Sequence, residues 1–242
     1  MDSTKITRPA RQLLSLKLKR CGAVIVASGT ASRMGGIDKV MAPLGGEPMI
    51  ARTVRAFQEC DAVSEIVVVT REDLILPITR LCAGMDKVTA VVVGGKSRQE
   101  SVHAGLNALS GKVKLAAIHD GARPLITWQL IDWVIRAANT YGAAAPAIPV
   151  KDTIKEVNGG IVKSTPDRAS LRAVQTPQVF DFDLIRGALK KAQLEGAELT
   201  DDCSAVERMG MSVKIVDGDE RNIKVTTPLD LKIAELFLEE MQ

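Results

Sequence analysis

Two basic residues near the start of the chain, Arg33 and Lys39, follow an apolar stretch and a loop of small residues. The apolar stretch covers 23–26, and the loop reads Ala-Ser-Gly-Thr-Ala over 27–31. Small side chains let backbone N–H groups approach phosphate oxygens, and a glycine can adopt positive φ where the turn needs it. This pattern predicts a nucleotide phosphate site formed by Ala27, Ser28, Gly29 and Thr30.

Arg33 and Lys39 are the candidate catalytic cations of this site. A guanidinium can bridge two phosphate oxygens, and a lysine ammonium is a mobile point charge that can follow charge as it develops. We therefore expect both residues to stabilise a transition state of phosphoryl transfer. The alternative for each residue is a solvated surface charge.

The two most familiar phosphate motifs do not fit. A dinucleotide fingerprint G-x-G-x-x-G would need a glycine where Ala31 stands. A P-loop over 90–97 would need a glycine in place of Ala90. These mismatches disfavour an NAD module and a P-loop NTPase, and Arg33-Met34 followed by Lys39 indicates a nucleotidyltransferase.

A chain of 242 residues with 46% hydrophobic and 25% charged residues fits one large α/β domain. The net charge is +3, and the six basic residues and one acidic residue of 1–20 give that segment +5, which leaves −2 for the remaining 222 residues. Aromatic residues make up only 3%, so a nucleic-acid partner is disfavoured. Residues 1–20 lack the apolar core of a signal peptide or membrane span, and we expect a flexible basic extension, with a short amphipathic helix over 13–18 as the alternative.

Cysteines and histidines are too dispersed to suggest a metal site. There is no C-x-x-C pair, so we expect buried thiols in a reducing cytoplasm. The two histidines, His103 and His119, are sixteen residues apart, and we expect both to be structural. The four cysteines are Cys21, Cys60, Cys82 and Cys203.

Runs of β-branched residues alternate with helix-length segments in the first 150 residues. Such a βαβ series predicts a Rossmann-like α/β fold, with a mainly parallel sheet covered by helices on both faces. The loops that follow strands in such a sheet share one rim, where ligands bind. The expected strands are 23–26, 65–70, 88–93, 115–118 and 143–148.

Asp120 follows the expected strand 115–118 and falls on that rim. One carboxylate beside a triphosphate is a common way to hold Mg²⁺, with water and phosphate oxygens as the other ligands. We therefore expect Asp120 to bind a divalent cation and the nucleotide. The alternative is an aspartate that caps the next helix.

The pattern changes after Pro149, where two short strands over 153–157 and 161–164 flank a glycine turn. An isolated two-stranded hairpin is marginally stable, so this arm, at about 150–175, should pack on a second copy of the chain. We expect a homodimer with exchanged arms. The rest of the single domain, 21–242, should add helices at 181–194 and 201–209, a strand at 212–216 and a helix after 228.

Five motifs in order resemble those of the 2-C-methyl-D-erythritol 4-phosphate cytidylyltransferase family, and the resemblance covers about residues 22–240. It implies that CTP and methylerythritol phosphate give CDP-methylerythritol and pyrophosphate, a step of the non-mevalonate isoprenoid route, with Mg²⁺ or another divalent cation. We expect no membrane partner, because residues 1–20 lack a long apolar core. The motifs are Ala27-Ser-Gly-Thr-x-x-Arg-Met34, His119-Asp-Gly-Ala-Arg-Pro124, Val150-Lys-Asp-Thr-Ile-Lys155, Gln175-Thr-Pro-Gln178 and Asn222-Ile-Lys-Val-Thr226.

The resemblance also assigns roles to individual residues. It implies that Arg168 and Lys224 position the attacking phosphate, and that Arg123, Thr153 and Thr200 surround the polyol. Arg123 and Thr153 match positions that the partner subunit contributes in the family. The residues that would close on the cytosine ring are Gly94, Gly95, Lys96 and Ser101.

The sequence departs from the family pattern at three places. Members usually have Pro-Ala-Ala-Gly where this chain has 26–29, and Pro-Lys-Gln around the residue that matches Lys39. Some members carry an acid where Arg221 stands, and here Asp219 and Glu220 lie just before it. A ribitol 5-phosphate cytidylyltransferase, a sugar-phosphate nucleotidyltransferase that uses UTP or GTP, and a non-catalytic CTP-binding protein are the alternatives.

Overall fold

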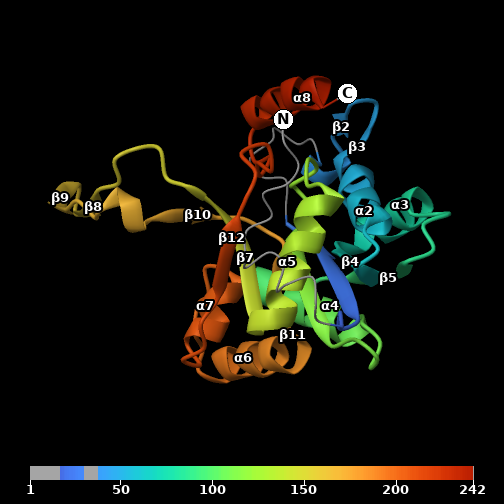
Figure 1. The fold of residues 1–242 in the computed structure, drawn as a ribbon. Helices are drawn as coiled ribbons and strands as arrows, with labels where there is room; N and C mark the ends of the chain where they lie inside the picture. Colours follow the sequence, from blue (N-terminus) through green and yellow to red (C-terminus); the bar gives the residue numbers. More distant parts are fainter. Residues whose placement is uncertain (1–16, 30–37, 242) are drawn as a thin grey trace, which may run out of the picture.

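The computed structural model describes residues 17–29 and 38–241. In this part of the chain, eight strands form one mixed sheet in the order β10-β7-β11-β6-β1-β4-β5, with β12 paired to β7 (Figure 1). Two strand pairs, β2-β3 and β8-β9, lie apart from that sheet. The central sheet is the element that brings distant parts of the sequence to one rim.

The parallel part of the sheet consists of β6 (Leu115–Asp120), β1 (Cys21–Val26), β4 (Val63–Thr70) and β5 (Val88–Val93). All adjacent pairs run parallel, and Val26 at the end of β1 is opposite Asp120 at the end of β6. The β-branched runs form these strands because both faces of the sheet are covered by helices. The predicted strands in this region are confirmed.

The other part of the sheet is mixed. It contains β7 (Ala143–Pro149), β10 (Arg172–Val174), β11 (Gln178–Asp181) and β12 (Lys214–Asp217). β11 is antiparallel to both β6 and β7, β10 is antiparallel to β7, and β12 is parallel to β7. β7 and β12 match expected strands, whereas β10 and β11 were not predicted.

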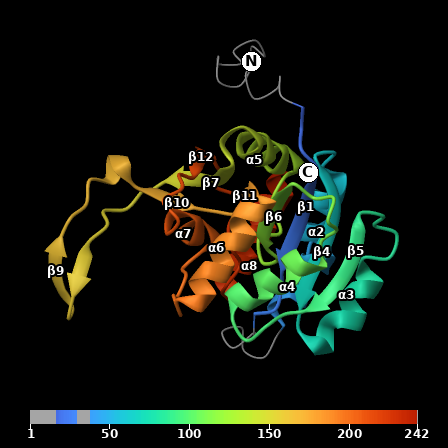
Figure 2. The same ribbon diagram turned by 90° about the horizontal axis from the view of Figure 1, so that it is seen from below.

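Helices cover both faces of the sheet, as predicted (Figure 2). One face packs against α2 (Met49–Glu59), α3 (Ile75–Leu81) and α5 (Trp128–Tyr141). The other packs against α4 (Arg98–Ala108), α6 (Phe182–Leu194) and α7 (Asp202–Glu207). Alternation along β1 explains this, because Ala23 and Ile25 face the first group of helices and Val24 faces the second.

A smaller apolar cluster lies beside the rim. The closing helix α8 (Pro228–Glu240) contributes Ala234 and Leu238, which pack with Leu44 of β2 (Pro43–Leu44). The pair β2-β3 is completed by β3 (Glu47–Pro48). Short 3-10 turns cover Lys39–Met41, Glu72–Leu74 and Arg168–Ser170.

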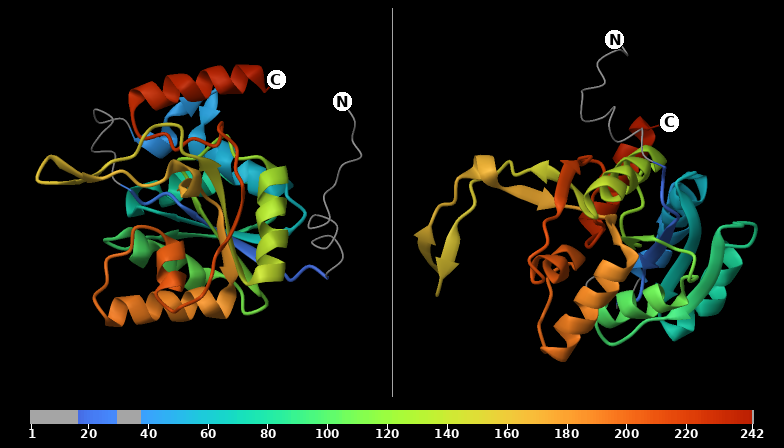
Figure 3. Two further views of the ribbon diagram at one scale, coloured as in Figure 1. Left: turned by 60° about the vertical axis from the view of Figure 1, so that its left-hand side comes forward. Right: turned by 60° about the horizontal axis from the view of Figure 1, so that its bottom comes forward.

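The predicted hairpin arm projects from the body of the molecule (Figure 3). β8 (Glu156–Asn158) and β9 (Ile161–Ser164) pair antiparallel, and both glycines of the turn between them have positive φ. Residues 151–165 are all exposed, including the apolar side chains of Val157 and Ile161. The arm thus makes few contacts with its own chain.

The last four residues of the predicted extension are docked on the fold. The carbonyl of Arg20 accepts N–H bonds from Lys114 and Leu115 at 2.8 and 3.0 Å, and Leu18 packs against the core. Lys19 pairs with Asp181 at 3.3 Å. The flexibility expected for residues 1–16, and most of the helix weighed for 13–18, lie outside the described residues.

The cysteines are buried with free thiols, as predicted. Within residues 17–29 and 38–241, no helix has both the length and the apolar character needed to cross a membrane.

Candidate active site

A cleft of about 460 Å³ opens where β1 and β6 end and where the loop after β5 enters α4. The rim predicted from the sequence therefore contains a cleft. Eight of the residues predicted from the sequence line it. These are Ala27, Ser28, Gly29, Lys39, Gly95, Lys96, Asp120 and Lys224.

Asp120 lies in the floor of the cleft with three cations around its carboxylate. Lys224 Nζ is 2.9 Å from Oδ2, Arg123 Nε is 3.7 Å from the same oxygen, and Arg98 Nε is 3.5 Å from Oδ1. The Asp120 side chain is 11% exposed. The carboxylate is thus almost buried and is approached by positive charge on both oxygens.

These cations keep Asp120 ionised. Burial by itself raises the pKa of the carboxyl, but Lys224 and then Arg98 outweigh it and hold the pKa well below its usual range. The alternative role as a helix cap is wrong, because α5 begins at Trp128 and its N-cap is Thr127. Asp120 therefore presents a charged oxygen ligand to the cleft.

His119 supports the floor from behind and is structural, as predicted. Its Nε2 is 3.3 Å from the Arg123 carbonyl, which can only accept, so Nε2 carries the proton. Its Nδ1 then accepts from the Thr176 hydroxyl at 2.9 Å, and that hydroxyl accepts the Asp120 N–H at 3.1 Å. Burial lowers the pKa of His119 to about 3, so the ring is neutral.

The two loops that flank the cleft meet at Ser101, which is fully buried. Its hydroxyl donates to the Ser97 carbonyl at 2.9 Å and accepts the Gly95 N–H at 3.1 Å and the Ser28 hydroxyl at 2.8 Å. A Cβ at Gly94 would lie 2.7 Å from the Cβ of Ser28, so this close approach needs glycine. Ser101 thus joins the loops after β1 and β5, and its contact with a cytosine ring stays a prediction.

Positive charge dominates the described lining of the cleft, where Asp120 is the one carboxylate. Arg71 and Arg98 were missed from the sequence, although each lies just after a strand or loop of the predicted rim. Arg71 pairs with Asp38 and with Asp73. The basic lining residues are Lys39, Arg71, Lys96, Arg98 and Lys224.

Four predicted substrate-binding residues do not line the cleft of their own chain, and three of these are exposed. Thr153 and Arg168 lie on the exposed arm, where Arg168 Nη1 donates to the Lys151 carbonyl at 2.6 Å. Thr200 is exposed in the turn before α7. Their contacts with a substrate stay predictions.

Arg123 is held inside its own chain, where its Nη1 donates to the Asn222 carbonyl at 2.7 Å, and its service to a partner's site stays a prediction. Thr30 and Arg33 lie outside the described residues.

The acids near Arg221 do not add a second carboxylate to the cleft. Asp219 pairs with Arg221 at 2.7 Å, and Glu220 pairs with Lys151 at 2.6 Å. No group of three or more His, Cys, Asp and Glu side chains that could hold a metal occurs in the described part of the chain. A divalent cation in the cleft would therefore have Asp120 as its protein ligand, with the rest supplied by substrate and water.

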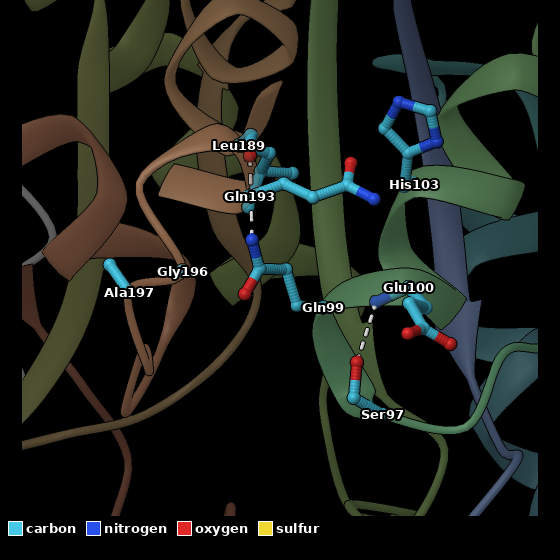
Figure 4. A pocket seen from close by; sticks show the side chains of 8 residues that line it. All are labelled: Ser97, Gln99, Glu100, His103, Leu189, Gln193, Gly196 and Ala197. Atoms are coloured by element: carbon cyan, nitrogen blue, oxygen red, sulfur yellow. Dashed lines mark hydrogen bonds between the residues drawn. The ribbon is translucent and has the colours of Figure 1, made fainter. Parts of the chain in front are cut away.

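A second, smaller cavity of about 230 Å³ lies between α4 and α6 (Figure 4). Gln99 of α4 donates to the Leu189 carbonyl of α6 at 3.4 Å, and Ser97 lines both this cavity and the cleft. Its lining includes His103, which was predicted to be structural, and none of the predicted site residues. The cavity lies beside α4, the helix that carries Arg98 and Ser101.

The mixed sheet with helices on both faces and the basic cleft at its rim define an α/β protein with a nucleotidyltransferase-like fold. The IspD family model, described as 2-C-methyl-D-erythritol 4-phosphate cytidylyltransferase, matches residues 21–240. The chain belongs to this family of cytidylyltransferase enzymes, as its motifs implied.

Individual relatives agree with the family. A 2-C-methyl-D-erythritol 4-phosphate cytidylyltransferase from Symbiobacterium thermophilum is 46% identical over 220 residues, which cover 90% of this chain and 92% of that protein. The crystal structure of 4-diphosphocytidyl-2C-methyl-D-erythritol synthase from Anaerococcus prevotii superposes with a TM-score of 0.83 at 31% identity, covering 91% of this chain and 96% of that one. The crystal structure of 2-C-methyl-D-erythritol 4-phosphate cytidylyltransferase from Thermus thermophilus superposes with a TM-score of 0.75 at 31% identity. The match covers 89% of this chain and 98% of that one.

Proposed function

We propose that the chain transfers CMP from CTP to 2-C-methyl-D-erythritol 4-phosphate and releases pyrophosphate. The observation that carries the proposal is the described lining of the cleft, which holds three lysines, two arginines and one ionised carboxylate, Asp120. Arg71 and Arg98 are paired with acids outside the lining, so we assign the lysines Lys39, Lys96 and Lys224 to a triphosphate and a second phosphate bound close together. Membership of the family supports the choice of substrates.

The reaction needs no protein nucleophile. An oxygen of the acceptor phosphate attacks the α-phosphorus of CTP in line, and the bond from that phosphorus to the bridging oxygen breaks, so that pyrophosphate leaves with the electron pair. Negative charge increases on the transferring group and on the leaving group. Catalysis by this chain then consists of holding two phosphates in position and stabilising that charge with Lys39, Arg33 and Lys224.

The nucleotide is held between two loops. The backbone of Ala27, Ser28 and Gly29 approaches the phosphates, and the loop at Gly95 closes on the base, with both loops joined through Ser101. The loops pack closely, since a Cβ at Gly94 would lie 2.7 Å from Ser28, and we propose that this closeness favours a pyrimidine over a larger purine. This arrangement supports CTP as the donor.

We propose Mg²⁺ as the cofactor, and the residues present fit it. Asp120 is ionised and nearly buried and directs its oxygens toward a cleft suited to phosphates, which is how a magnesium ion with one protein carboxylate is held. When bound, the ion would supply charge neutralisation on the phosphate oxygens. Lys224 and Arg98 keep Asp120 deprotonated and oriented for this role.

We propose that a second copy of the chain completes the binding site for the acceptor. Arg168 and Thr153 lie on an arm that projects from the body and exposes Val157 and Ile161, so their side chains can serve a cleft only where the arm meets another surface. A homodimer with exchanged arms supplies that surface and covers the apolar side chains.

Pyrophosphate release from purified protein, CTP and Mg²⁺ tests the proposed function. Methylerythritol 4-phosphate and ribitol 5-phosphate are the two acceptors, and UTP, GTP and ATP replace CTP in parallel reactions. We expect release only with CTP and methylerythritol phosphate. Release with ribitol phosphate would change the acceptor, and release with UTP or GTP would change the donor. No release with any pair would favour a non-catalytic CTP-binding protein.

Mixing two defective variants tests the exchanged arms at an acceptor concentration well below KM. Asp120→Asn disables the cleft, and Arg168→Ala weakens acceptor binding by the arm. If arms are exchanged, a mixed dimer contains one site built from two intact parts, so mixing and reassociation should raise the rate above the mean of the two variants. A mixture whose rate stays at that mean would contradict the exchange.

A further inference from the structure

We propose that Arg98 is a positioning residue that fixes the orientation of the Asp120 carboxylate, and that Asp202 holds Arg98 in place for this task. The inference rests on the proposed function for its kinetic consequences. Its geometry rests on contacts between α4, α7 and the end of β6.

The Arg98 guanidinium lies between two carboxylates. Its Nη1 donates to Asp202 Oδ1 at 3.0 Å and its Nη2 donates to Asp202 Oδ2 at 2.7 Å, while its Nε is 3.5 Å from Asp120 Oδ1. The open end of the guanidinium fork is therefore occupied by Asp202. The edge that remains faces Asp120, so Arg98 is arranged to hold a carboxylate in the cleft and not to grip a substrate phosphate with its fork.

Asp202 is a rigid anchor for Arg98. Its side chain is 2% exposed, and it is the first residue of α7. The Gln178 Oε1 accepts the backbone N–H of Asp202 and of Cys203 at 2.9 and 3.0 Å, and the Gln178 amide donates to Asp201 at 2.8 Å. Gln178 belongs to β11, directly opposite Ile118 of β6. The anchor is thus tied to the same strand that carries Asp120.

Asp120 needs such a partner because its own backbone does not fix its carboxylate plane. The terminal torsion of an aspartate is broad, and its two oxygens exchange places easily. Lys224 and Arg123 both approach Oδ2, and the Lys224 side chain is 42% exposed. Among the described contacts of the carboxylate, Arg98 is the partner of Oδ1, and it is the one braced from behind by a buried acid.

Kinetics of Arg98→Lys and Asp202→Asn test the proposal. We expect each variant to lower kcat by about tenfold, because a displaced catalytic group costs rate more than binding, with the KM for CTP changed by less than about threefold. Arg208→Lys is the matched control, since Arg208 pairs with Glu195 at 2.8 Å beside α7 and does not line the cleft. A rise in KM at unchanged kcat would overturn the proposal by indicating a direct substrate contact.

A second measurement separates positioning from an independent role. In an Asp120→Asn background, we expect Arg98→Lys to cause no further loss of the residual rate, because Arg98 acts through Asp120. An equal tenfold loss in both backgrounds would contradict this. Thermal unfolding of each variant identifies any general loss of fold, and the Asp202→Asn variant repeats the test without changing Arg98 itself.

A crystal structure of Arg98→Lys gives a readout that does not need turnover. We expect the Asp120 carboxylate to rotate or to occupy two orientations, while β6 stays in place. An unchanged carboxylate would overturn the proposal even if the enzyme is active. An inactive wild-type protein in the pyrophosphate assay would instead contradict the proposed function and leave this structural test in force.

Discussion

The floor of the cleft and the hairpin arm differ in how their functional side chains are held. Asp120 is bounded by three cations and supported by Thr176 and His119, all from its own chain. Residues 151–165 of the arm are exposed throughout, and Arg168 bonds to the arm itself. The floor is organised by contacts within one chain, whereas the function proposed for the arm requires another surface.

This difference separates two contributions to catalysis. Charged groups fixed in the floor can stabilise the transition state without reorganising, so their loss should lower kcat. In the proposed reaction, groups on the arm bind the acceptor, so their loss should mainly raise the KM for that substrate. Substitutions in the two regions should therefore have different kinetic signatures.

Asp120→Asn should have the largest effect. It removes a negative charge that three cations surround and leaves them repelling one another, and it removes the proposed metal ligand. We expect kcat/KM in the pyrophosphate assay to fall by at least about 10³-fold. Asp217→Asn, on the exposed surface of β12, should retain normal activity. A loss of less than tenfold would remove Asp120 from the mechanism.

Arg33→Ala should have the next largest effect. Arg33 lies outside the described residues, and its role is predicted from the sequence. Loss of one preorganised charge that stabilises the transition state should lower kcat by roughly 10²-fold, with an unchanged unfolding transition. Near-normal turnover would show that the cations of the described lining suffice.

Arg168→Ala should give the signature of the arm. We expect the KM for the acceptor phosphate to rise by about tenfold, because one charged hydrogen bond is lost, with the KM for CTP unchanged. Arg172→Ala, a neighbouring exposed arginine, is the control. Equal rises in both KM values would place Arg168 with the nucleotide and end the contrast between floor and arm.

The smallest expected effect is a pH dependence of stability that comes from His119, the residue that supports the floor. The pKa of His119 is lowered from 6.5 to about 3 by burial, so the unfolded chain binds a proton that the folded chain does not. Stability from this residue is present above pH 6.5 and is lost as the pH falls toward 3, by about 2 kcal/mol between pH 7 and pH 5. Urea unfolding of the wild type and of His119→Asn at pH 7 and pH 5 measures this loss of stability. The free energy of unfolding of the variant should fall less between the two pH values than that of the wild type. An equal fall would contradict the lowered pKa of His119.

Much of the fold could be predicted because its signals are local. The β-branched runs of β1, β4 and β5 and the glycine turn between β8 and β9 need only a few adjacent residues to be recognised. β10 and β11 could not be found this way, since they have three and four residues and Pro177 lies between them. They exist because β7 and β6 offer them pairing partners.

The same distinction holds for the site. The loop glycines, Asp120 and Lys224 follow strands or lie in recognisable motifs, and the structure brings them together. Arg71 and Arg98 look like ordinary surface charges in the sequence. Their partners Asp38 and Asp202 are 33 and 104 positions away, so only the folded chain reveals them.

The docked segment 17–20 has a consequence for how the chain folds during synthesis. It leaves the ribosome early, yet its contacts lie far along the sequence, with Asn139 at a separation of 120 residues from Lys19 and Asp181 at 162. The central strand β1 has the same property, since its partner β6 begins at Leu115. β1 must therefore wait for β6, and the docked segment for Asp181, so the nascent chain carries β1 with one unpaired edge until β6 has been synthesised.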